Sequence, residues 1–466
     1  MTSKTKQVRV IGGGLAGCEA AWQLANAGLE VELCEMKPVR RTPAQVSDGL
    51  AELVCSNSFR SAALGNAVGL VKEEMRRAGG FLMRCAEEAK VPAGDALAVD
   101  REHFSGVVEA ALLGHPNIHM TRAEVTSLPD DGTPTVVCTG PLTADALAAD
   151  IARRCGRERL AFYDAIAPIV EADSVDMSRA FFKSRYGKGE GTDYLNCPMT
   201  KEEFDRFFDA LTAADLVTAK AFEDLHYFEG CLPLEVMASR GRQTLTFGPM
   251  KPVGLEHPET QQRFHAVLQL RKEDVHGTAY NMVGCQTRLR QPAQREVFRL
   301  IPGLESATFL RFGAIHRNTY LDAPALLDEW GRLATVSQPV FFAGQITGVE
   351  GYVESTASGL LVAWLVTDWL AGRSLDVPPV TTMLGGLYRH VRGELRADPT
   401  AAYSPSNVTW AMVPPIEKRA PKAAKRELMA QRSLDDLDAW LRARSASGRY
   451  RGEQASLGMA AAPAFP

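Results

Sequence analysis

The hydrophobic pattern of the first 35 residues predicts a strand, a helix and a second strand in succession. The apolar run Val8–Ile11 has the length of a short buried strand, and the stretch after Gly14 has the spacing of an amphipathic helix that ends near Gly28. A second apolar run, Val31–Glu35, ends in an acidic residue. This order is typical of the first unit of a doubly wound parallel sheet.

The turn before the helix has the spacing G-x-G-x-x-G, at Gly12, Gly14 and Gly17. The first glycine permits a tight turn, the second lets a pyrophosphate approach the backbone, and the third lets helix and strand pack closely. The helix start offers N–H groups and a positive dipole end to phosphates. Glu35 stands where a carboxylate would accept the ribose hydroxyls of an adenosine. The pattern predicts a bound dinucleotide; the alternative is a glycine-rich turn in a sheet that binds none.

Strand–helix alternation continues through about the first third of the chain and returns near its end. Thr135–Gly140 predicts a short buried strand, either one that passes near the first nucleotide or an ordinary sheet strand. Val340–Gly351 predicts a strand, a glycine turn and a helix start, against which another part of the same cofactor should lie. The predicted cofactor-binding residues are Gly12, Gly13, Gly14, Leu15, Ala16, Gly17, Glu35, Thr139, Gly140, Gly344, Gln345 and Gly348.

The stretch between these two parts departs from the alternation, with aromatic and glycine-rich loops and proline-bounded segments. Within it, Thr200–Glu203 predicts a capping box, and apolar residues at helical spacing follow from Phe204. The predicted fold is α/β, a Rossmann-like doubly wound domain with a large inserted α+β domain. Its predicted parts are the nucleotide-binding domain at 1–160 and 330–440, the inserted domain at 161–329, and a disordered tail at 441–466.

Composition narrows the class of protein. The 466 residues are 45% hydrophobic, enough for a large core and more than one domain. A net charge of −4 excludes a general polyanion binder, so any nucleic-acid surface must be a local patch. No apolar run approaches the ~20 residues of a membrane span. Nine cysteines without a C-x-x-C pair indicate reduced thiols in a cytosol, with no disulfide framework and no metal site.

Several stretches are idiosyncratic and resemble one family, the folate- and FAD-dependent tRNA (uracil-5-)-methyltransferases (TrmFO), over about residues 8 to 420. The matching stretches are Ile11–Ala21, Leu53–Phe59, Thr139–Thr143, Phe162–Ile169, Phe228–Pro233, Gly284–Leu289, Ile315–Thr319 and Phe342–Gly348. One run departs from the family's Asn-x-Asn-x-Gly-Leu pattern: it reads Asn407-Val-Thr-Trp-Ala-Met before paired prolines, so no role is transferred to Thr409.

The resemblance implies a cytoplasmic enzyme that forms 5-methyluridine at position 54 of the tRNA T-loop. It implies FAD as cofactor, with methylenetetrahydrofolate as carbon donor and NADH or NADPH to reduce the flavin. The implied partners are tRNA and folate, with no membrane and no obligate protein partner.

This chemistry requires a thiolate and a hydride donor. Uracil C5 is a poor nucleophile until a low-pKa cysteine adds to C6, and a methylene at C5 must then be reduced to methyl, which reduced flavin can do. Cys55 and Cys231 match the family's functional pair. We assign Cys231 as the nucleophile and Cys55 to the flavin intermediate or to acid–base work, roles that could be exchanged. A free cysteine is otherwise most often a buried hydrophobe, which is expected of Cys18, Cys34 and Cys138; Cys285 is a reserve candidate.

Three basic stretches are candidates for contacts with RNA phosphates, each with a solvated basic face as the alternative. They are the loop 183–188, the segment 288–299, where Pro292 suits a helix start, and the tract 418–426. The residues predicted to bind tRNA are Arg288, Arg295, Arg299, Lys418 and Arg419. His316 and Arg317 are candidates for contact with folate or flavin, or are structural.

Four rival functions differ from this one in the sequence features that they require. A relative that modifies the wobble uridine carries a long helical extension that this sequence lacks. A non-catalytic flavin-binding tRNA chaperone would need neither Cys55 nor Cys231. A thiol–disulfide oxidoreductase would need a closely spaced dithiol, and an S-adenosylmethionine enzyme would not need the second glycine turn.

Overall fold

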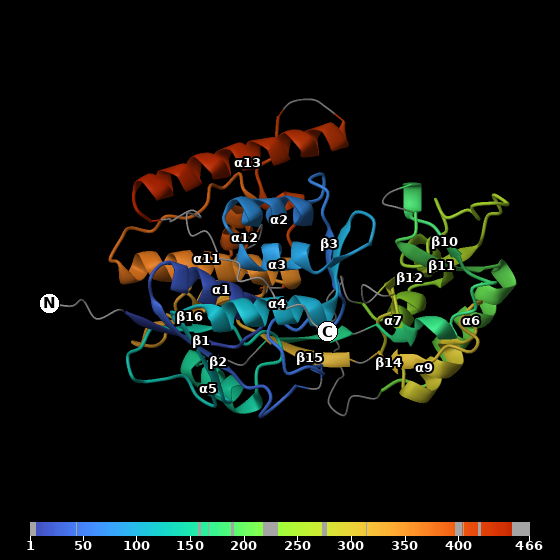
Figure 1. Ribbon diagram of the computed structural model, residues 1–466, viewed down its shortest axis with the longest axis horizontal. Helices are drawn as coiled ribbons and strands as arrows, with labels where there is room; N and C mark the ends of the chain where they lie inside the picture. The colour runs from blue at the N-terminus through green and yellow to red at the C-terminus, as the bar shows by residue number, and fades with distance from the viewer. Residues whose placement is uncertain are drawn as a thin grey trace, which may run out of the picture.

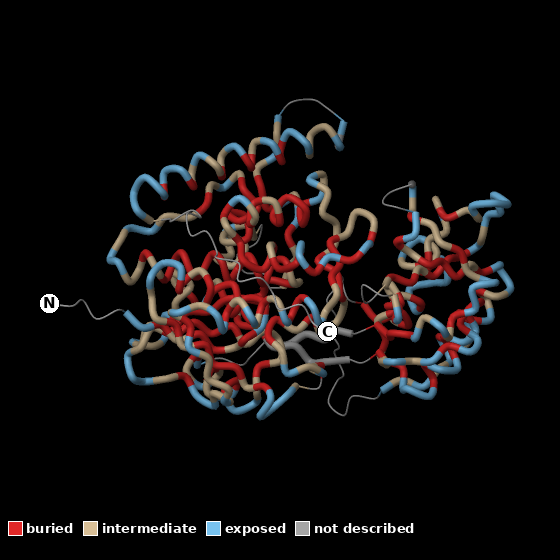
Figure 2. The backbone as a smooth tube through the Cα atoms, in the orientation of Figure 1, coloured by how far each residue is buried: buried red, intermediate tan, exposed pale blue. Residues whose placement is uncertain are grey.

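The computed structural model describes two lobes of unequal size (Figure 1). The described residues are 6–42, 44–156, 160–165, 167–187, 191–217, 232–272, 277–313, 315–396, 403, 405–417 and 421–449, with only the backbone for 160–165, 187, 315–319 and 422. Cys231, Lys418 and Arg419 lie outside them. Buried residues concentrate inside each lobe (Figure 2).

A five-stranded parallel sheet with the order β16-β7-β1-β2-β6 forms the base of the larger lobe. Its strands are β1 (Gln7–Ile11), β2 (Glu30–Glu35), β6 (Ile118–Arg122), β7 (Thr135–Val137) and β16 (Val340–Phe342). The main helices around it are α1 (Leu15–Asn26), α4 (Arg101–Gly114), α5 (Asp145–Cys155) and α11 (Tyr352–Leu370). Since parallel strands are covered on both faces, their apolar runs are nearly continuous. The predicted Rossmann-like fold is confirmed.

A small antiparallel sheet and further helices complete this lobe. The strands are β3 (Ser58–Ser61), β4 (Lys90–Val91) and β5 (Ala96–Val99). The helices are α2 (Ala67–Arg77), α3 (Phe81–Glu88), α10 (Ala323–Leu326), α12 (Met383–Val391) and α13 (Lys422–Ala446). Figure 1 shows α13 lying across the outside of α2 and α12.

The smaller lobe contains an antiparallel sheet with the order β10-β11-β12-β13-β9-β14. Its strands are β9 (Ile169–Glu171), β10 (Phe181–Phe182), β11 (Tyr194–Met199), β12 (Ala266–Lys272), β13 (Ala279–Met282) and β14 (Phe309–Arg311). Its helices are α6 (Lys201–Ala213), α7 (Leu234–Ser239), α8 (Arg242–Phe247) and α9 (Gln291–Phe298). The antiparallel pair β8 (Leu160–Ala165) and β15 (Ile315–Tyr320) lies between the lobes (Figure 1).

The smaller lobe has its own apolar core, on one face of its sheet. Alternate residues such as Leu195, Leu268 and Leu270 are fully buried there with the phenylalanines of α6. The Thr200 hydroxyl accepts from the Glu203 N–H while the Glu203 carboxylate accepts from the Thr200 N–H, so the predicted capping box is present. The other face of this sheet carries polar side chains.

The chain from 441 to 449 is ordered, so the prediction of a disordered tail beginning at 441 is wrong for these residues. Helix α13 continues to Ala446, Leu441 is buried, and the Arg444 guanidinium donates to Asp368 at 3.0 Å and Asp376 at 2.8 Å. The alanine-rich composition gave no sign of these distant partners. Residues 450–466 lie outside the described part of the chain.

No helix among the described residues combines the length and apolar character that crossing a bilayer requires.

The buried Glu74 carboxylate ties α2 to two other helices and predicts a pH-dependent stability. It accepts from the N–H groups of Met383 and Leu384 at 2.8 Å and from the Ser433 hydroxyl, and burial raises its pKa from 4.5 to about 7. The folded protein therefore binds a proton between pH 4.5 and 7 that the unfolded chain releases. This contribution is complete below pH 4.5 and is lost as the pH rises through 7.

We expect the free energy of unfolding of the wild type, relative to a Glu74→Gln variant, to fall by about 3 kcal/mol between pH 4.5 and pH 8. Urea unfolding of both proteins across this range measures the difference. A difference that stays constant with pH would show that Glu74 does not titrate in this way.

Candidate functional site

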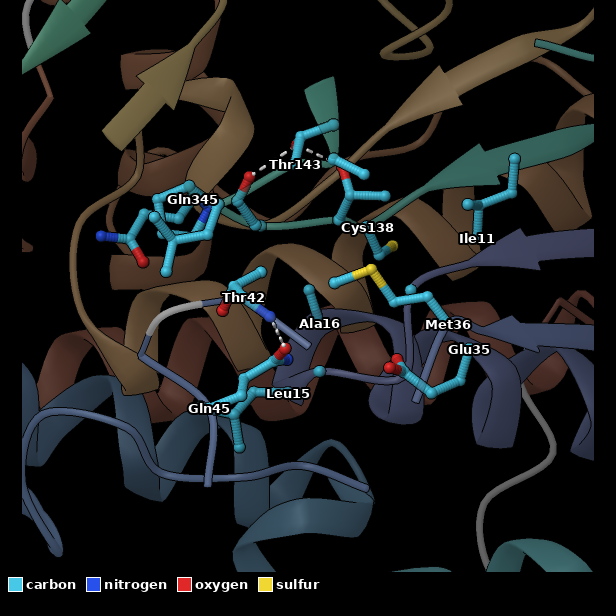
Figure 3. Close-up of a pocket in the computed structure, with 18 of the residues that line it drawn as sticks. Ile11, Leu15, Ala16, Glu35, Met36, Thr42, Gln45, Cys138, Thr143 and Gln345 are labelled. Atoms are coloured by element: carbon cyan, nitrogen blue, oxygen red, sulfur yellow. Dashed lines mark hydrogen bonds between the residues drawn. The ribbon is translucent and has the colours of Figure 1, made fainter. Parts of the chain in front are cut away.

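A cleft opens at the carboxyl ends of the parallel strands, next to the starts of α1 and α11 (Figure 3). This is where doubly wound sheets bind their ligands, since the turns after the strands meet there. The predicted cofactor residues that line it are Gly12, Gly14, Leu15, Ala16, Glu35, Thr139, Gly140, Gly344 and Gln345. The two glycine turns, more than 300 positions apart in the sequence, therefore face one cavity.

The wall formed by the first turn is bare backbone. Gly14 is the N-cap of α1 and makes no side-chain cap, and a Cβ built on it would meet nothing within 4 Å. Gly12 has φ +104°, and a Cβ there would lie 2.6 Å from the Cys138 carbonyl oxygen. The N–H groups at the start of α1 can thus be approached closely by a ligand. This arrangement fits a pyrophosphate.

Glu35 lies at the end of β2, buried except for 5% of its surface (Figure 3). One carboxylate oxygen accepts from the Gly13 N–H at 2.7 Å, the other from the Lys37 N–H at 3.0 Å. Each oxygen keeps a lone pair, so the carboxylate can also accept ribose hydroxyls. The residues at both ends of the cleft therefore fit a dinucleotide such as FAD.

Three predicted cofactor residues do not line the cleft. Gly13 lies behind the turn, where it donates to Glu35. A Cβ on Gly17 would lie 1.8 Å from the Gly12 carbonyl oxygen, so this glycine permits helix–strand contact. A Cβ on Gly348 would lie 2.4 Å from the Tyr403 ring. Gly13 therefore positions Glu35, while Gly17 and Gly348 permit close packing.

The cleft extends to Val54 and Tyr352, and Cys55 follows directly. The Tyr352 hydroxyl oxygen lies 2.7 Å from the Cys55 N, 3.2 Å from the Ser56 N and 2.9 Å from the Cys55 Sγ. Since the two N–H groups occupy its lone pairs, the hydroxyl proton is directed at the sulfur. Burial raises the pKa of Tyr352 well above its usual value, so it stays protonated and can stabilise a thiolate at Cys55.

Tyr352 was not predicted from the sequence. It opens α11 directly after Gly351, whose φ is +106°. A tyrosine that follows a glycine turn has no special pattern, and its partner stands 297 residues away in the chain. Only the folded structure brings the two together.

The other described cysteines are buried. Burial raises the thiol pKa of each of them: Cys18, Cys34, Cys85, Cys138, Cys155, Cys197 and Cys285. Cys285, the reserve candidate, is fully buried in the core of the smaller lobe. Among the eight described cysteines, Cys55 alone is partly exposed.

The smaller lobe reaches the Cys55 loop through Arg271 of β12. Its guanidinium donates to the Asn57 Oδ1 at 3.0 Å and to the Ser56 Oγ at 2.9 Å, and the Asn57 amide donates to the Lys272 carbonyl at 2.9 Å. Arg271 is only 7% exposed. The orientation of the Cys55 loop is therefore fixed from both lobes.

The described arginines predicted to bind tRNA lie in or next to α9 and have intramolecular partners. The Arg288 guanidinium lies 3.7 Å from the Glu235 carboxylate, Arg295 stacks over Phe312, and Arg299 donates to the Ala307 carbonyl at 2.8 Å. Arg295 and Arg299 remain exposed. The side chains of His316 and Arg317 are outside the described part of the structure.

Residues 7–374 match the family model of glucose inhibited division protein A. Two similar proteins carry the name methylenetetrahydrofolate--tRNA-(uracil-5-)-methyltransferase TrmFO. The one from Anaeromyxobacter dehalogenans strain 2CP-1 is 56% identical over 438 residues, covering 93% of this chain and 96% of its own. That from Geobacter sulfurreducens is 54% identical, covering 94% and 99%. The structure of Aquifex aeolicus GidA in its form II crystal shares the fold, with a TM-score of 0.65 at 14% identity over 96% of this chain and 77% of that one.

The bare backbone at Gly14 predicts a variant that loses the cofactor and keeps the fold. In Gly14→Ala the methyl group fits the empty cleft but stands where a pyrophosphate would approach. We expect an unchanged melting temperature and FAD affinity at least about tenfold weaker. Gly106→Ala, on α4 and also without near neighbours, is the matched control that keeps FAD affinity. Equal affinity in both variants would contradict this position for the phosphates.

The Tyr352 hydroxyl predicts the reactivity of Cys55. Without the donor to sulfur, Tyr352→Phe should slow alkylation of Cys55 by iodoacetamide at pH 7 by roughly three- to tenfold. Peptide mass spectrometry measures the rate at this site. Tyr388→Phe, which loses only a bond to the Glu329 carbonyl, is the control. If Tyr352→Phe reacts as fast as this control, the hydroxyl does not stabilise the thiolate.

Proposed function

The chain belongs to the glucose inhibited division protein A family and, within it, to the TrmFO methyltransferases, and on this premise we propose that it forms 5-methyluridine at position 54 of tRNA. The carbon comes from methylenetetrahydrofolate, and NADH or NADPH supplies the electrons. The observation that carries the proposal is the continuity of the dinucleotide cleft with a partly exposed cysteine held by a tyrosine hydroxyl.

FAD is the cofactor that the cleft would hold. The backbone of Gly12 and Gly14 and the start of α1 would bind its pyrophosphate, and Glu35 its ribose. Gly344 and Gln345 support the part that extends toward α11. When bound and reduced, FAD supplies the hydride that converts a methylene on C5 of the base into a methyl group.

Cys231 and Cys55 have separate roles in the reaction. Cys231 is the nucleophile that adds to C6 of the uracil, which makes C5 nucleophilic. Cys55, with the Tyr352 hydroxyl directed at its sulfur, takes the proton that C5 must lose after the new carbon–carbon bond has formed. The exchange of these two roles is the alternative.

The tRNA binds to basic residues of the smaller lobe and of the tract 418–426. Arg288, Arg295 and Arg299, which lie in or next to α9, would contact the phosphates, and the sequence adds Lys418 and Arg419 as further candidates. The exposure of Arg295 and Arg299 on one side of α9 supports this part of the proposal. The enzyme works in the cytoplasm, without a membrane and without an obligate protein partner.

The proposal predicts the products of a defined reaction. Purified protein with FAD, methylenetetrahydrofolate and NADH or NADPH, kept anaerobic, should convert unmodified tRNA to tRNA with one 5-methyluridine, measured by nucleoside mass spectrometry. A tRNA with cytidine at position 54 is the matched substrate that should stay unmodified. If the uridine tRNA also stays unmodified, the proposed function is wrong.

Variants of the two cysteines test the mechanism separately. Cys55→Ala and Cys231→Ala should each lower turnover at least about 10³-fold while tRNA binding stays within about twofold, because neither thiol is needed to hold phosphates. Cys285→Ala, which removes a buried thiol, should keep turnover. Wild-type turnover in either of the first two variants would contradict a catalytic role for that cysteine.

A further inference from the structure

One transverse row of the smaller lobe's sheet faces the larger lobe. Pairing aligns Tyr194, Arg271, Asn281, Ile169 and Arg311 directly across β11, β12, β13, β9 and β14. Residues opposite one another in a sheet project from the same face, and neighbouring strands lie about 4.8 Å apart. These five side chains therefore stand side by side on the polar face.

Three members of this row contact the larger lobe. The Tyr194 hydroxyl donates to the Ala93 carbonyl at 3.3 Å, Arg271 donates to Ser56 and Asn57, and Arg311 donates to the Ala44 carbonyl at 3.4 Å. Asn281 lies between the last two contacts. The row thus bridges the lobes on both sides of Asn281.

The two flanking contacts end beside the cofactor cleft. Ser56 is the neighbour of Cys55, and Ala44 is the neighbour of Gln45, which lines the cleft. Asn281 therefore lies in the sheet row between a contact to the Cys55 loop and a contact to the segment beside the mouth of the cleft.

The side-chain amide of Asn281 has a hydrogen-bond donor that lacks an acceptor among the described residues. It is only 3% exposed, and its Nδ2 has no hydrogen-bond partner among the described residues. Asn196, on the same face two residues after Tyr194, shows the ordinary case, because its fully buried amide donates to the carbonyls of Phe181 and Lys183. An unpaired buried amide destabilises the fold, so a ligand acceptor is the natural partner for it.

We propose that Asn281 donates a hydrogen bond to a ring carbonyl of the substrate heterocycle held against the Cys55 loop. The acceptor is the oxygen of a lactam or imide ring, a chemistry that uracil and the pterin of a folate share. The neighbouring Ile169 offers an apolar surface to the same ring, and Arg271 keeps the Cys55 loop in place beside it. This inference rests on the proposed function for the identity of the two heterocycles.

The test uses Asn281→Leu, which keeps the size of the side chain and removes its polar atoms. Because the donor is unpaired in the free protein, the melting temperature should stay the same or rise. The matched control Asn196→Leu removes a satisfied amide from the same face and should lower the melting temperature. The FAD content of Asn281→Leu should equal that of the wild type.

Binding to the FAD-loaded protein is then titrated with two probes, tetrahydrofolate and a T-arm RNA hairpin with uridine at position 54. Affinity about tenfold weaker for tetrahydrofolate alone identifies the pterin carbonyl, and the same loss for the hairpin alone identifies the uracil carbonyl. In turnover, the KM of the affected substrate should rise by a similar factor.

The proposal is overturned if both probes bind Asn281→Leu as they bind the wild type, if the wild type binds neither probe, or if both affinities fall together. It is also overturned if the melting temperature falls as in Asn196→Leu, or if FAD is lost. These titrations are independent of catalysis. A wild type that binds the probes but makes no 5-methyluridine would refute the proposed function and leave Asn281 to be judged by binding alone.

Discussion

The close approach of α1 and α11 is the constraint on which the site depends. A Cβ on Gly359 of α11 would lie 2.3 Å from the Ala16 carbonyl oxygen of α1, and a Cβ on Gly17 would lie 1.8 Å from the Gly12 carbonyl oxygen. Only glycine permits these contacts: the first brings α1 and α11 together at one cleft, and the second packs α1 against the turn after β1. The same packing places Tyr352, the first residue of α11, against the Cys55 loop. A larger residue at either glycine would move both the cofactor wall and the tyrosine.

The local parts of this arrangement could be predicted from the sequence, and the long-range parts could not. The first glycine turn and Glu35 were predicted because strand, turn and helix follow one another within 35 residues. Gly348 was grouped with them on spacing alone, yet it packs on Tyr403. The partners of the Cys55 loop escaped prediction because Tyr352 and Arg271 are distant in the chain. Their contacts depend on how the helices and lobes pack, which no local pattern records.

The Cys55 loop is the point at which the two lobes act on one reactive group. Tyr352 holds its backbone and sulfur from the larger lobe, while Arg271 holds the next two residues from the smaller lobe. A change in the angle between the lobes would therefore alter the position of the Cys55 loop and its thiol. Since α9 and the arginines proposed to bind tRNA belong to the smaller lobe, tRNA bound there would act on the Cys55 loop through this contact.

The central claim is that this chain takes a carbon from a folate and places it on a uracil. The most direct measurement supplies methylenetetrahydrofolate with a ¹³C-labelled methylene group, together with unlabelled S-adenosylmethionine, to the FAD-loaded protein and unmodified tRNA. The account predicts 5-methyluridine that is one mass unit heavier, at position 54 and nowhere else in the tRNA. Unlabelled 5-methyluridine, or label at another base, would contradict it.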